Sequence, residues 1–266
     1  MRRAWRVAWR SSALALWTLL CTIQVAFAKV ALRPWPEAAW RWRGRWMRRW
    51  GLGFRHVLSI DLRVDGEPPP EPFFLVSNHL GYLDIPLFAA VANVVFVAKS
   101  EVSGWPLLGT VCRVADTVFV VRASRRDSLR ANEALVEHMQ AGHSVLLFPE
   151  GTTSDGRRIG PFRPPLLQAP ARCGRPVYAA VVEYATAEGD PPASEAVCWW
   201  GDMPLLPHLK VLLGVSTITA RLRFSPRAVQ ESDRKLLAAR LHESALRLAG
   251  DREREDEVWQ VARGSL

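Results

Sequence analysis

The feature that most constrains this chain is an uncharged stretch of 18 residues, Ser11 to Ala28, close to the N-terminus. As a helix it would cover roughly 27 Å, which nearly matches a hydrocarbon core of about 30 Å. Basic residues flank it on both sides, so charge does not fix an orientation across a bilayer. A helix that lies within one leaflet is therefore an alternative to a spanning helix.

Positive charge and tryptophan gather in the same N-terminal fifth. Residues 1–50 hold eleven Lys or Arg and one acidic residue, a net charge of +10, whereas the remainder holds 24 basic and 25 acidic residues. Eight of the twelve tryptophans also lie in residues 1–50. Nucleic-acid binding would spread basic residues over a folded face, but arginine and tryptophan around an apolar stretch are typical of the membrane–water interface. We therefore expect membrane lipids as partners and no nucleic acid.

Two helices are expected in this region. The apolar one covers residues 11–32 and the amphipathic, Trp- and Arg-rich one covers residues 38–50, with a proline-containing break at 34–36 between them. The pattern predicts membrane-associated helices over residues 1–55 and a globular domain over residues 56–266.

Two alternatives stay open for the N-terminal region. Trp42, Trp46 and Trp50 share one helical face, and they could face lipid or pack on the protein itself. Ala26-Phe27-Ala28 follows a basic segment and an apolar run, as a signal-peptidase site does, so cleavage there is a further alternative.

Beyond residue 56, short apolar runs alternate with helical patterns. Strands are expected at 73–77, 94–98, 117–122, 144–148, 177–184 and 217–224, and helices after Pro86, over 129–140 and from Ser232 to Leu248. This alternation indicates an α/β fold with a mixed sheet flanked by helices, whose functional turns follow strand ends. The four cysteines show no CxxC spacing or metal-ligand grouping, so neither a disulfide nor a metal site is expected.

His79 directly follows the first of these strands, and Asp84 lies five residues further on. A neutral imidazole can take a proton from an attacking hydroxyl, and a carboxylate can fix its tautomer. Positions i and i+5 of one helix lie about 140° apart, so the pair meets only if His79 precedes a helix that contains Asp84. Taken alone, this spacing is more typical of a surface histidine followed by a helix cap.

A second polar segment, Phe-Pro-Glu-Gly-Thr-Thr-Ser at 148–154, follows another strand. It places the carboxylate of Glu150 at the sheet edge, where sites of α/β folds lie, although an ordinary capped turn has the same composition. Lys99 and Arg122 end two further strands and could bind an anionic head group. Solvated charge at a strand end is the alternative for either residue.

Together and in this order, the segments resemble the glycerolipid acyltransferase family, whose signature is His-x4-Asp followed by Phe-Pro-Glu-Gly-Thr. The resemblance covers roughly residues 70–225. It implies that His79 is the general base and Asp84 its partner. The substrate-binding residues that it implies, with the cation of the strand at 94–98 added, are Asn78, Lys99, Arg122, Glu150, Gly151 and Thr152.

The resemblance implies an O-acyltransferase that moves a fatty acyl group from a thioester of coenzyme A or acyl carrier protein to a lysolipid hydroxyl. The first candidate acceptor is 1-acyl-sn-glycerol-3-phosphate, in phospholipid biosynthesis. No covalent acyl-enzyme, cofactor or metal is implied. The implied location is the bacterial inner membrane, with the catalytic domain at its cytoplasmic face.

Two departures from the family pattern leave alternatives open. Thr153 stands where the family often has arginine, which removes one phosphate-binding cation. Residues 152–156 and 200–203 are similar to a branch of the family that acylates lyso-ornithine lipids, whose amino-acid head group carries no phosphate. An alternative of another class is a non-catalytic module whose function is membrane binding.

Overall fold

The computed structural model describes residues 2–121 and 125–263 and is built on one seven-stranded sheet. Its strands are β1 (Ile60–Asp65), β2 (Phe74–Ser77), β3 (Val94–Lys99), β4 (Val118–Val120), β5 (Ser144–Leu147), β6 (Val177–Thr186) and β7 (Ile218–Phe224). The strand order is β1-β7-β6-β2-β5-β3-β4. Only β6 and β7 run antiparallel within this sheet, so the predicted mixed α/β sheet is confirmed.

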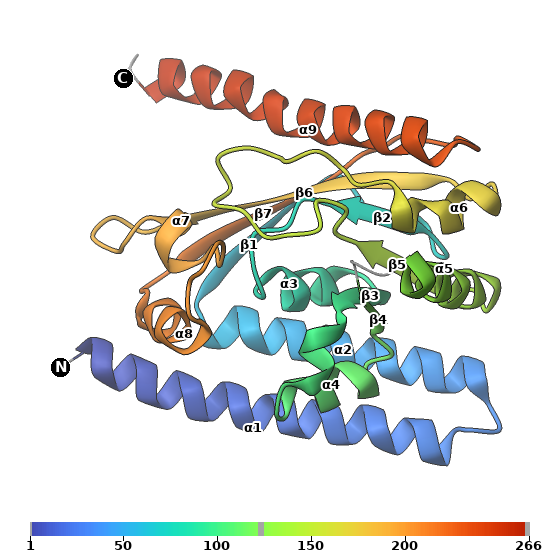
Figure 1. Cartoon of the computed structure of the whole chain (residues 1–266). Helices are drawn as coiled ribbons and strands as arrows, with labels where there is room; N and C mark the ends of the chain where they lie inside the picture. The colour runs from blue at the N-terminus through green and yellow to red at the C-terminus, as the bar shows by residue number, and fades with distance from the viewer. Residues whose placement is uncertain (1, 122–124, 264–266) are drawn as a thin grey trace.

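Helices cover both faces of the sheet (Figure 1). They are α1 (Arg2–Ala31), α2 (Pro36–Val57), α3 (Asp84–Val91), the 3-10 turn η1 (Ser100–Gly104), α4 (Leu108–Val114), α5 (Arg125–Gln140), the 3-10 turn η2 (Pro165–Leu167), α6 (Gln168–Arg172), α7 (Ala193–Ala196), α8 (Leu205–Gly214) and α9 (Arg234–Arg263). One core packs α1, α2, α3 and α8 against the sheet, and the other packs α5, α6 and α9. Alternate strand residues supply the two cores, since successive side chains point to opposite faces: in β2, Leu75 joins the first core and Phe74 the second.

Most predicted strands occur within one or two residues of their expected bounds. The strand expected at 117–122 is shorter, and its last residue lies outside the described part of the chain. Strand β1 was missed, although Ile60, Leu62 and Val64 alternate with charged residues as in a half-buried strand. Helices α4 and α8 were missed as well.

Helices α1 and α2 form an antiparallel hairpin that turns at the two prolines, and each is longer than predicted. Tryptophan N–H groups hold the hairpin together. The Trp42 indole donates to the Gln24 carbonyl, and the Trp50 indole donates to the Thr18 hydroxyl, at 3.1 and 3.0 Å. For Trp42 and Trp50, packing on the protein itself is therefore the better of the two alternatives left open. The division of the chain near residue 55 stays a prediction.

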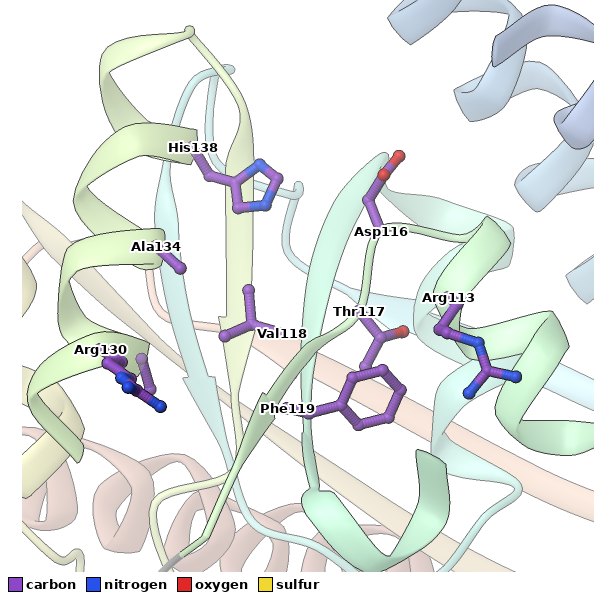
Figure 2. A pocket seen from close by; sticks show the side chains of 9 residues that line it. Arg113, Asp116, Thr117, Val118, Phe119, Arg130, Ala134 and His138 are labelled. Atoms are coloured by element: carbon purple, nitrogen blue, oxygen red, sulfur yellow. The ribbon is translucent and has the colours of Figure 1, made fainter. Parts of the chain in front are cut away.

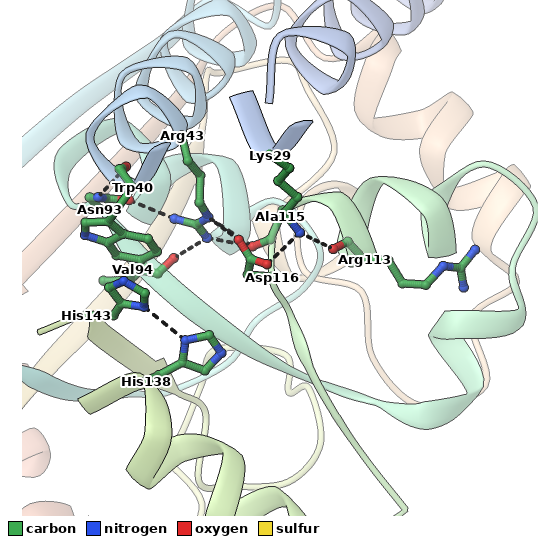
Figure 3. A network of polar contacts seen from close by, with 10 residues as sticks. All are labelled: Lys29, Trp40, Arg43, Asn93, Val94, Arg113, Ala115, Asp116, His138 and His143. Carbon is green, nitrogen blue, oxygen red and sulfur yellow. Dashed lines mark hydrogen bonds and ion pairs between the residues drawn. The ribbon is translucent and has the colours of Figure 1, made fainter. Parts of the chain in front are cut away.

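One arginine of α2 points into the protein (Figure 3). The buried Arg43 guanidinium donates to the carbonyls of Ala115 and Val94 and to the Asn93 amide oxygen, at 2.7 to 3.2 Å. Asp116 lies 3.5 Å away. Burial lowers the pKa of Arg43 to about 10, so the group is still charged at neutral pH. Arg43 thus fastens the hairpin to the sheet edge at the end of α4, whose last carbonyls need donors.

We expect Arg43→Ala to lower the free energy of unfolding by about 3 kcal/mol, because it leaves several buried carbonyls without their donor. Arg45→Ala is the matched control, since Arg45 is exposed on the same helix and should change stability by less than about 0.5 kcal/mol. Chemical denaturation measures both variants. Equal stabilities would show that the buried network does not fasten the hairpin.

Candidate active site

The two polar segments meet beyond the carboxyl ends of two neighbouring strands in the middle of the sheet. Strands β2 and β5 are parallel neighbours with Val76 opposite Leu147, so the turns after their carboxyl ends lie side by side. The His79 N–H donates to Glu150 Oε1 at 2.9 Å, and the Ser154 N–H donates to the His79 carbonyl at 3.0 Å. The second turn therefore holds the backbone of the first.

Asp84 is completely buried in the first turn of α3. Its Oδ2 atom accepts hydrogen bonds from His79 Nδ1 at 2.6 Å, the Leu80 N–H at 2.7 Å and the Gly81 N–H at 3.1 Å. His79 lies in the turn before the helix, as the spacing requires. A carboxylate only accepts hydrogen bonds, so Nδ1 carries the proton and Nε2 is the ring nitrogen that can accept one.

The His79 ring is fixed on its face as well as at its edge. It stacks on Phe148 with ring centroids 4.1 Å apart and planes 12° apart, and its side chain is 19% exposed. Phe148 comes from the segment after β5, so both polar segments orient the imidazole. The geometry suits a general base that meets its substrate at the edge of the sheet.

Tyr184 completes the surroundings of Asp84, and no motif in the sequence predicts this contact. Its hydroxyl donates to Asp84 Oδ1 at 2.6 Å from strand β6. Burial, then the charge of Asp84, raises the pKa of Tyr184 well above its usual value, so the phenol stays protonated and remains a donor. No spacing rule links a tyrosine one hundred residues away to this turn; only the sheet order brings β6 beside β2.

Glu150 lies against the backbone of the site. Its Oε2 atom accepts the Gly160 N–H at 2.8 Å, while Oε1 accepts the His79 N–H. Burial raises the pKa of Glu150, although the two backbone hydrogen bonds oppose this. The structure gives Glu150 a positioning part, and its predicted contact with the acceptor stays a prediction.

Asn78 is also committed to the backbone. Its amide nitrogen donates to the Val182 carbonyl at 2.9 Å, and its amide oxygen accepts the Val182 N–H at 2.8 Å. The side chain thus continues the pairing of β2 with β6 past the end of β2, and it is buried. Its predicted contact with substrate stays a prediction.

Arg163 is a cation of the site that the sequence analysis missed. Gly151 has a positive φ of 77°, and a Cβ on it would lie 3.1 Å from Arg163 Cδ. The exposed Arg163 side chain therefore crosses the Gly151 backbone, beside the exposed Thr152. Arg163, Gly151 and Phe148 also line a mostly apolar cavity of about 110 Å³.

The remaining predicted cations are placed differently. Lys99 is exposed at the end of β3, two strands from β2 in the sheet order. Arg122 lies outside the described residues. The predicted roles of both in head-group binding stay predictions.

A separate cavity of about 450 Å³ lies at the sheet edge between β4 and α5 (Figure 2). Arg113, Asp116, Arg130 and His138 are among its lining residues, and none of the predicted site residues that the structure describes lines it. Within the described ranges, no group of three or more His, Cys, Asp or Glu side chains is placed to hold a metal ion.

Comparison with known proteins identifies relatives of the same kind. A family model described as Acyltransferase matches residues 61–183. The lyso-ornithine lipid O-acyltransferase of Pseudomonas aeruginosa is 36% identical over 208 residues, which cover 78% of this chain and 79% of that protein. The 1-acyl-sn-glycerol-3-phosphate acyltransferase of Neisseria meningitidis is 33% identical over 214 residues, 79% of this chain and 82% of that protein.

A solved structure shows the same fold. The crystal structure of the 1-acyl-sn-glycerophosphate (LPA) acyltransferase PlsC from Thermotoga maritima matches with a TM-score of 0.63, covering 94% of this chain and 98% of that chain at 21% identity. The resemblance seen in the sequence is confirmed, and the similarity decides for an enzyme over the non-catalytic alternative. With the His79 and Asp84 pair assembled and such relatives along most of its length, the chain belongs to the acyltransferase family.

Proposed function

We propose that this enzyme transfers a fatty acyl group from a thioester to the hydroxyl of a lysolipid, with His79 as the general base. The observation that carries the proposal is the His79 imidazole, held through Nδ1 by the buried Asp84 with Nε2 left to accept a proton. Its relatives are named as acyltransferases of lysolipids, which supports the acceptor class.

In the proposed reaction, His79 Nε2 takes the proton of the acceptor hydroxyl while the hydroxyl oxygen attacks the thioester carbonyl carbon. The carbon–sulfur bond then breaks, and the imidazolium returns its proton to the leaving thiolate. The charge of Asp84 stabilises the imidazolium between the two steps. The donor is a thioester of coenzyme A or of acyl carrier protein, and the products are the diacyl lipid and the free thiol.

A lyso-ornithine lipid is the acceptor that the relatives favour. The Pseudomonas aeruginosa protein named lyso-ornithine lipid O-acyltransferase is 36% identical over 78% of this chain, above the 33% of the Neisseria meningitidis protein. Thr153, in place of a cation, fits a head group without phosphate.

Lysophosphatidate is the second candidate, and Arg163 is the observation that favours it. The Arg163 side chain lies across Gly151 and could meet an anionic head group there. It would supply the positive charge that the family's arginine supplies at the position of Thr153. Neisserial relatives named 1-acyl-sn-glycerol-3-phosphate acyltransferase are 33% identical.

Membrane attachment through α1 is part of the proposal. Among the described helices, α1 alone is long and apolar enough to cross a membrane. Its exposed apolar side chains form one stripe on the face opposite its buried residues. The stripe, named here the α1 stripe, consists of Trp5, Leu16, Leu19, Leu20, Ile23, Phe27 and Val30.

Both ends of α1 are fastened to the catalytic domain, which favours a helix that lies in one leaflet. Arg10 donates to the carbonyls of Leu213 and Val215 at the end of α8. Lys29, roughly 28 Å further along the helix, donates to the Arg113 carbonyl and pairs with Asp116. We propose that the stripe lies at the bacterial inner membrane with the catalytic domain on the cytoplasmic side, where acyl thioesters are made.

We expect His79→Ala to lower kcat by about 10²- to 10⁴-fold without unfolding the protein, because it removes the base from a partly exposed turn. Asp84→Asn should lose a comparable factor, since the imidazolium then lacks its counter-charge. Thiol release from a labelled thioester with a panel of lysolipids measures the activity. His56→Ala, an exposed histidine at the end of α2, is the control, and wild-type activity in His79→Ala would remove the base from the mechanism.

Tyr184→Phe tests whether the hydroxyl on Asp84 positions the pair. We expect kcat to fall about tenfold while the KM values for both substrates stay within about twofold, because no substrate contact is removed. The loss of one hydrogen bond to a buried charge should lower the free energy of unfolding by about 1.5–3 kcal/mol. A change confined to KM would instead place the hydroxyl in substrate binding.

Arg163→Gln distinguishes the two acceptors. With lysophosphatidate, loss of the cation should raise the KM for the acceptor about tenfold and leave the KM for the thioester unchanged. With a lyso-ornithine lipid the acceptor KM should rise less, since no phosphate dianion is bound. Steady-state kinetics with both acceptors measures this, with Arg240→Gln on α9 as the control. A rise in the thioester KM alone would contradict the assignment.

Charges on the α1 stripe test membrane attachment. We expect the double variant Leu19→Glu, Ile23→Glu to bind phospholipid vesicles at least tenfold more weakly than wild type, because each change replaces exposed apolar surface with a charge. Leu246→Glu is the control, since Leu246 is exposed on α9 across the sheet. Sedimentation with vesicles measures binding, and unchanged binding of the double variant would place the attachment surface elsewhere.

A further inference from the structure

The backbone at Leu107 adopts a conformation that leucine rarely takes. Its φ is 61° and its ψ is −56°, and the Leu108 N–H donates to the Pro106 carbonyl at 2.7 Å. This is the rare and strained form of a γ-turn. The Leu107 side chain that it presents is 84% exposed, the largest exposed fraction among the exposed large apolar residues described. A strained backbone conformation together with an apolar side chain in solvent indicates that this residue has a functional role.

The segment is held firmly in this shape. The Trp105 N–H donates to the Val102 carbonyl at 3.1 Å, and the Gly109 N–H donates to the Trp105 carbonyl at 2.9 Å. Gly109 is buried, and a Cβ on it would lie 2.2 Å from the Ser103 carbonyl oxygen. Leu107 therefore projects from a closely packed turn, and a simple collapse onto the protein would break these contacts.

One side of this segment leads, through α4, to α1. Residues 105–108, named here the 105–108 loop, lead directly into α4, which packs beside α1 (Figure 1). Lys29 Nζ donates to the Arg113 carbonyl of α4 at 3.0 Å (Figure 3). Lys29 and the exposed Arg113 place basic groups where α4 meets α1, as at the level of lipid head groups.

The other side of the loop adjoins the catalytic turn. The Trp105 ring meets the Trp199 ring edge to face, with ring centroids 6.4 Å apart. The Trp199 ring in turn lies beside the Tyr82 ring, with ring centroids 6.1 Å apart. The Trp199 N–H donates to the Leu80 carbonyl at 2.8 Å, one residue beyond His79. Two aromatic contacts thus connect the loop to the turn that carries the base.

We propose that the 105–108 loop is a second lipid-inserting element, which dips Leu107 into the bilayer and holds the rim of the His79 turn at the membrane surface. The proposal rests on the membrane attachment proposed above and adds a surface outside the N-terminal hairpin. The packing of α4 beside α1, the half-buried Trp105 and the basic groups of Lys29 and Arg113 favour a lipid bilayer as the occupant. A lysolipid in that bilayer then reaches the site without leaving the membrane.

The test compares Leu107→Asn with Leu236→Asn, a matched exposed leucine on α9 across the sheet. Both proteins are titrated with vesicles of phosphatidylethanolamine and phosphatidylglycerol at limiting lipid. We expect the partition coefficient of Leu107→Asn to fall about tenfold, the scale of losing one inserted leucine, and that of Leu236→Asn to match wild type. The melting temperature of Leu107→Asn should stay within a few degrees of wild type, since no packing is removed.

A depth measurement gives an independent readout. Bimane attached through Leu107→Cys, with Cys112 and Cys173 replaced by serine, should be quenched by brominated acyl chains, whereas bimane at Leu236→Cys should not. Wild-type vesicle binding by Leu107→Asn together with an unquenched probe would overturn the proposal. If Leu107→Asn instead converted a dimer of this protein to monomers and left vesicle binding unchanged, Leu107 would belong to a contact between two copies. That result would overturn the proposal as well. If the wild-type protein itself does not bind vesicles, the membrane attachment proposed above fails as well. Failure of the loop proposal alone would leave vesicle binding by the wild-type protein intact.

Discussion

The site depends on one buried carboxylate, that of Asp84. An ionised carboxylate without partners is costly to bury, and here four donors surround it: the His79 ring, the Leu80 and Gly81 N–H groups and the Tyr184 hydroxyl. These donors come from the turn after β2 and from β6. The same hydrogen bonds therefore satisfy the charge, shape the turn, fix the tautomer of the base and join two strands. Glu150 adds a second such clamp from the turn after β5, on the His79 N–H.

The N-terminal hairpin shows how one segment can face two environments. Its inward side uses polar groups: Arg10 and Arg43 donate to carbonyls at helix ends and strand ends, and tryptophan N–H groups join α1 to α2. Its outward side is the apolar α1 stripe. A water-soluble amphipathic helix turns its one apolar face to the core, whereas α1 carries apolar residues on both its buried and its exposed face. Part of the +10 charge of residues 1–50 therefore serves attachment of the hairpin to the rest of the protein, and in the membrane attachment proposed above the exposed remainder would face anionic lipids.

Sequence reasoning predicted the pairing of His79 with Asp84 because the signal there is local. His79 and Asp84 lie in one turn, and the strands that carry the polar segments are short apolar runs, so spacing and periodicity are enough. The partners that come from distant strands were not accessible in this way. Tyr184, Arg163 and the Val182 backbone reach the site only through the sheet order and the path of the loop after β5. Similarly, Arg43 has the same local pattern as its exposed neighbours, and only tertiary packing shows that it points inward.

The central claim is that Asp84 holds the His79 ring with Nδ1 protonated and Nε2 free to accept the acceptor's proton. Nitrogen NMR of protein labelled at histidine measures this tautomer directly, with the His79→Ala spectrum identifying the resonances. In the neutral ring, the account predicts a protonated Nδ1 with a strongly deshielded proton, and an Nε2 with the shift of an unprotonated nitrogen. A neutral ring protonated on Nε2, or an exchange-averaged mixture of both tautomers, would contradict it.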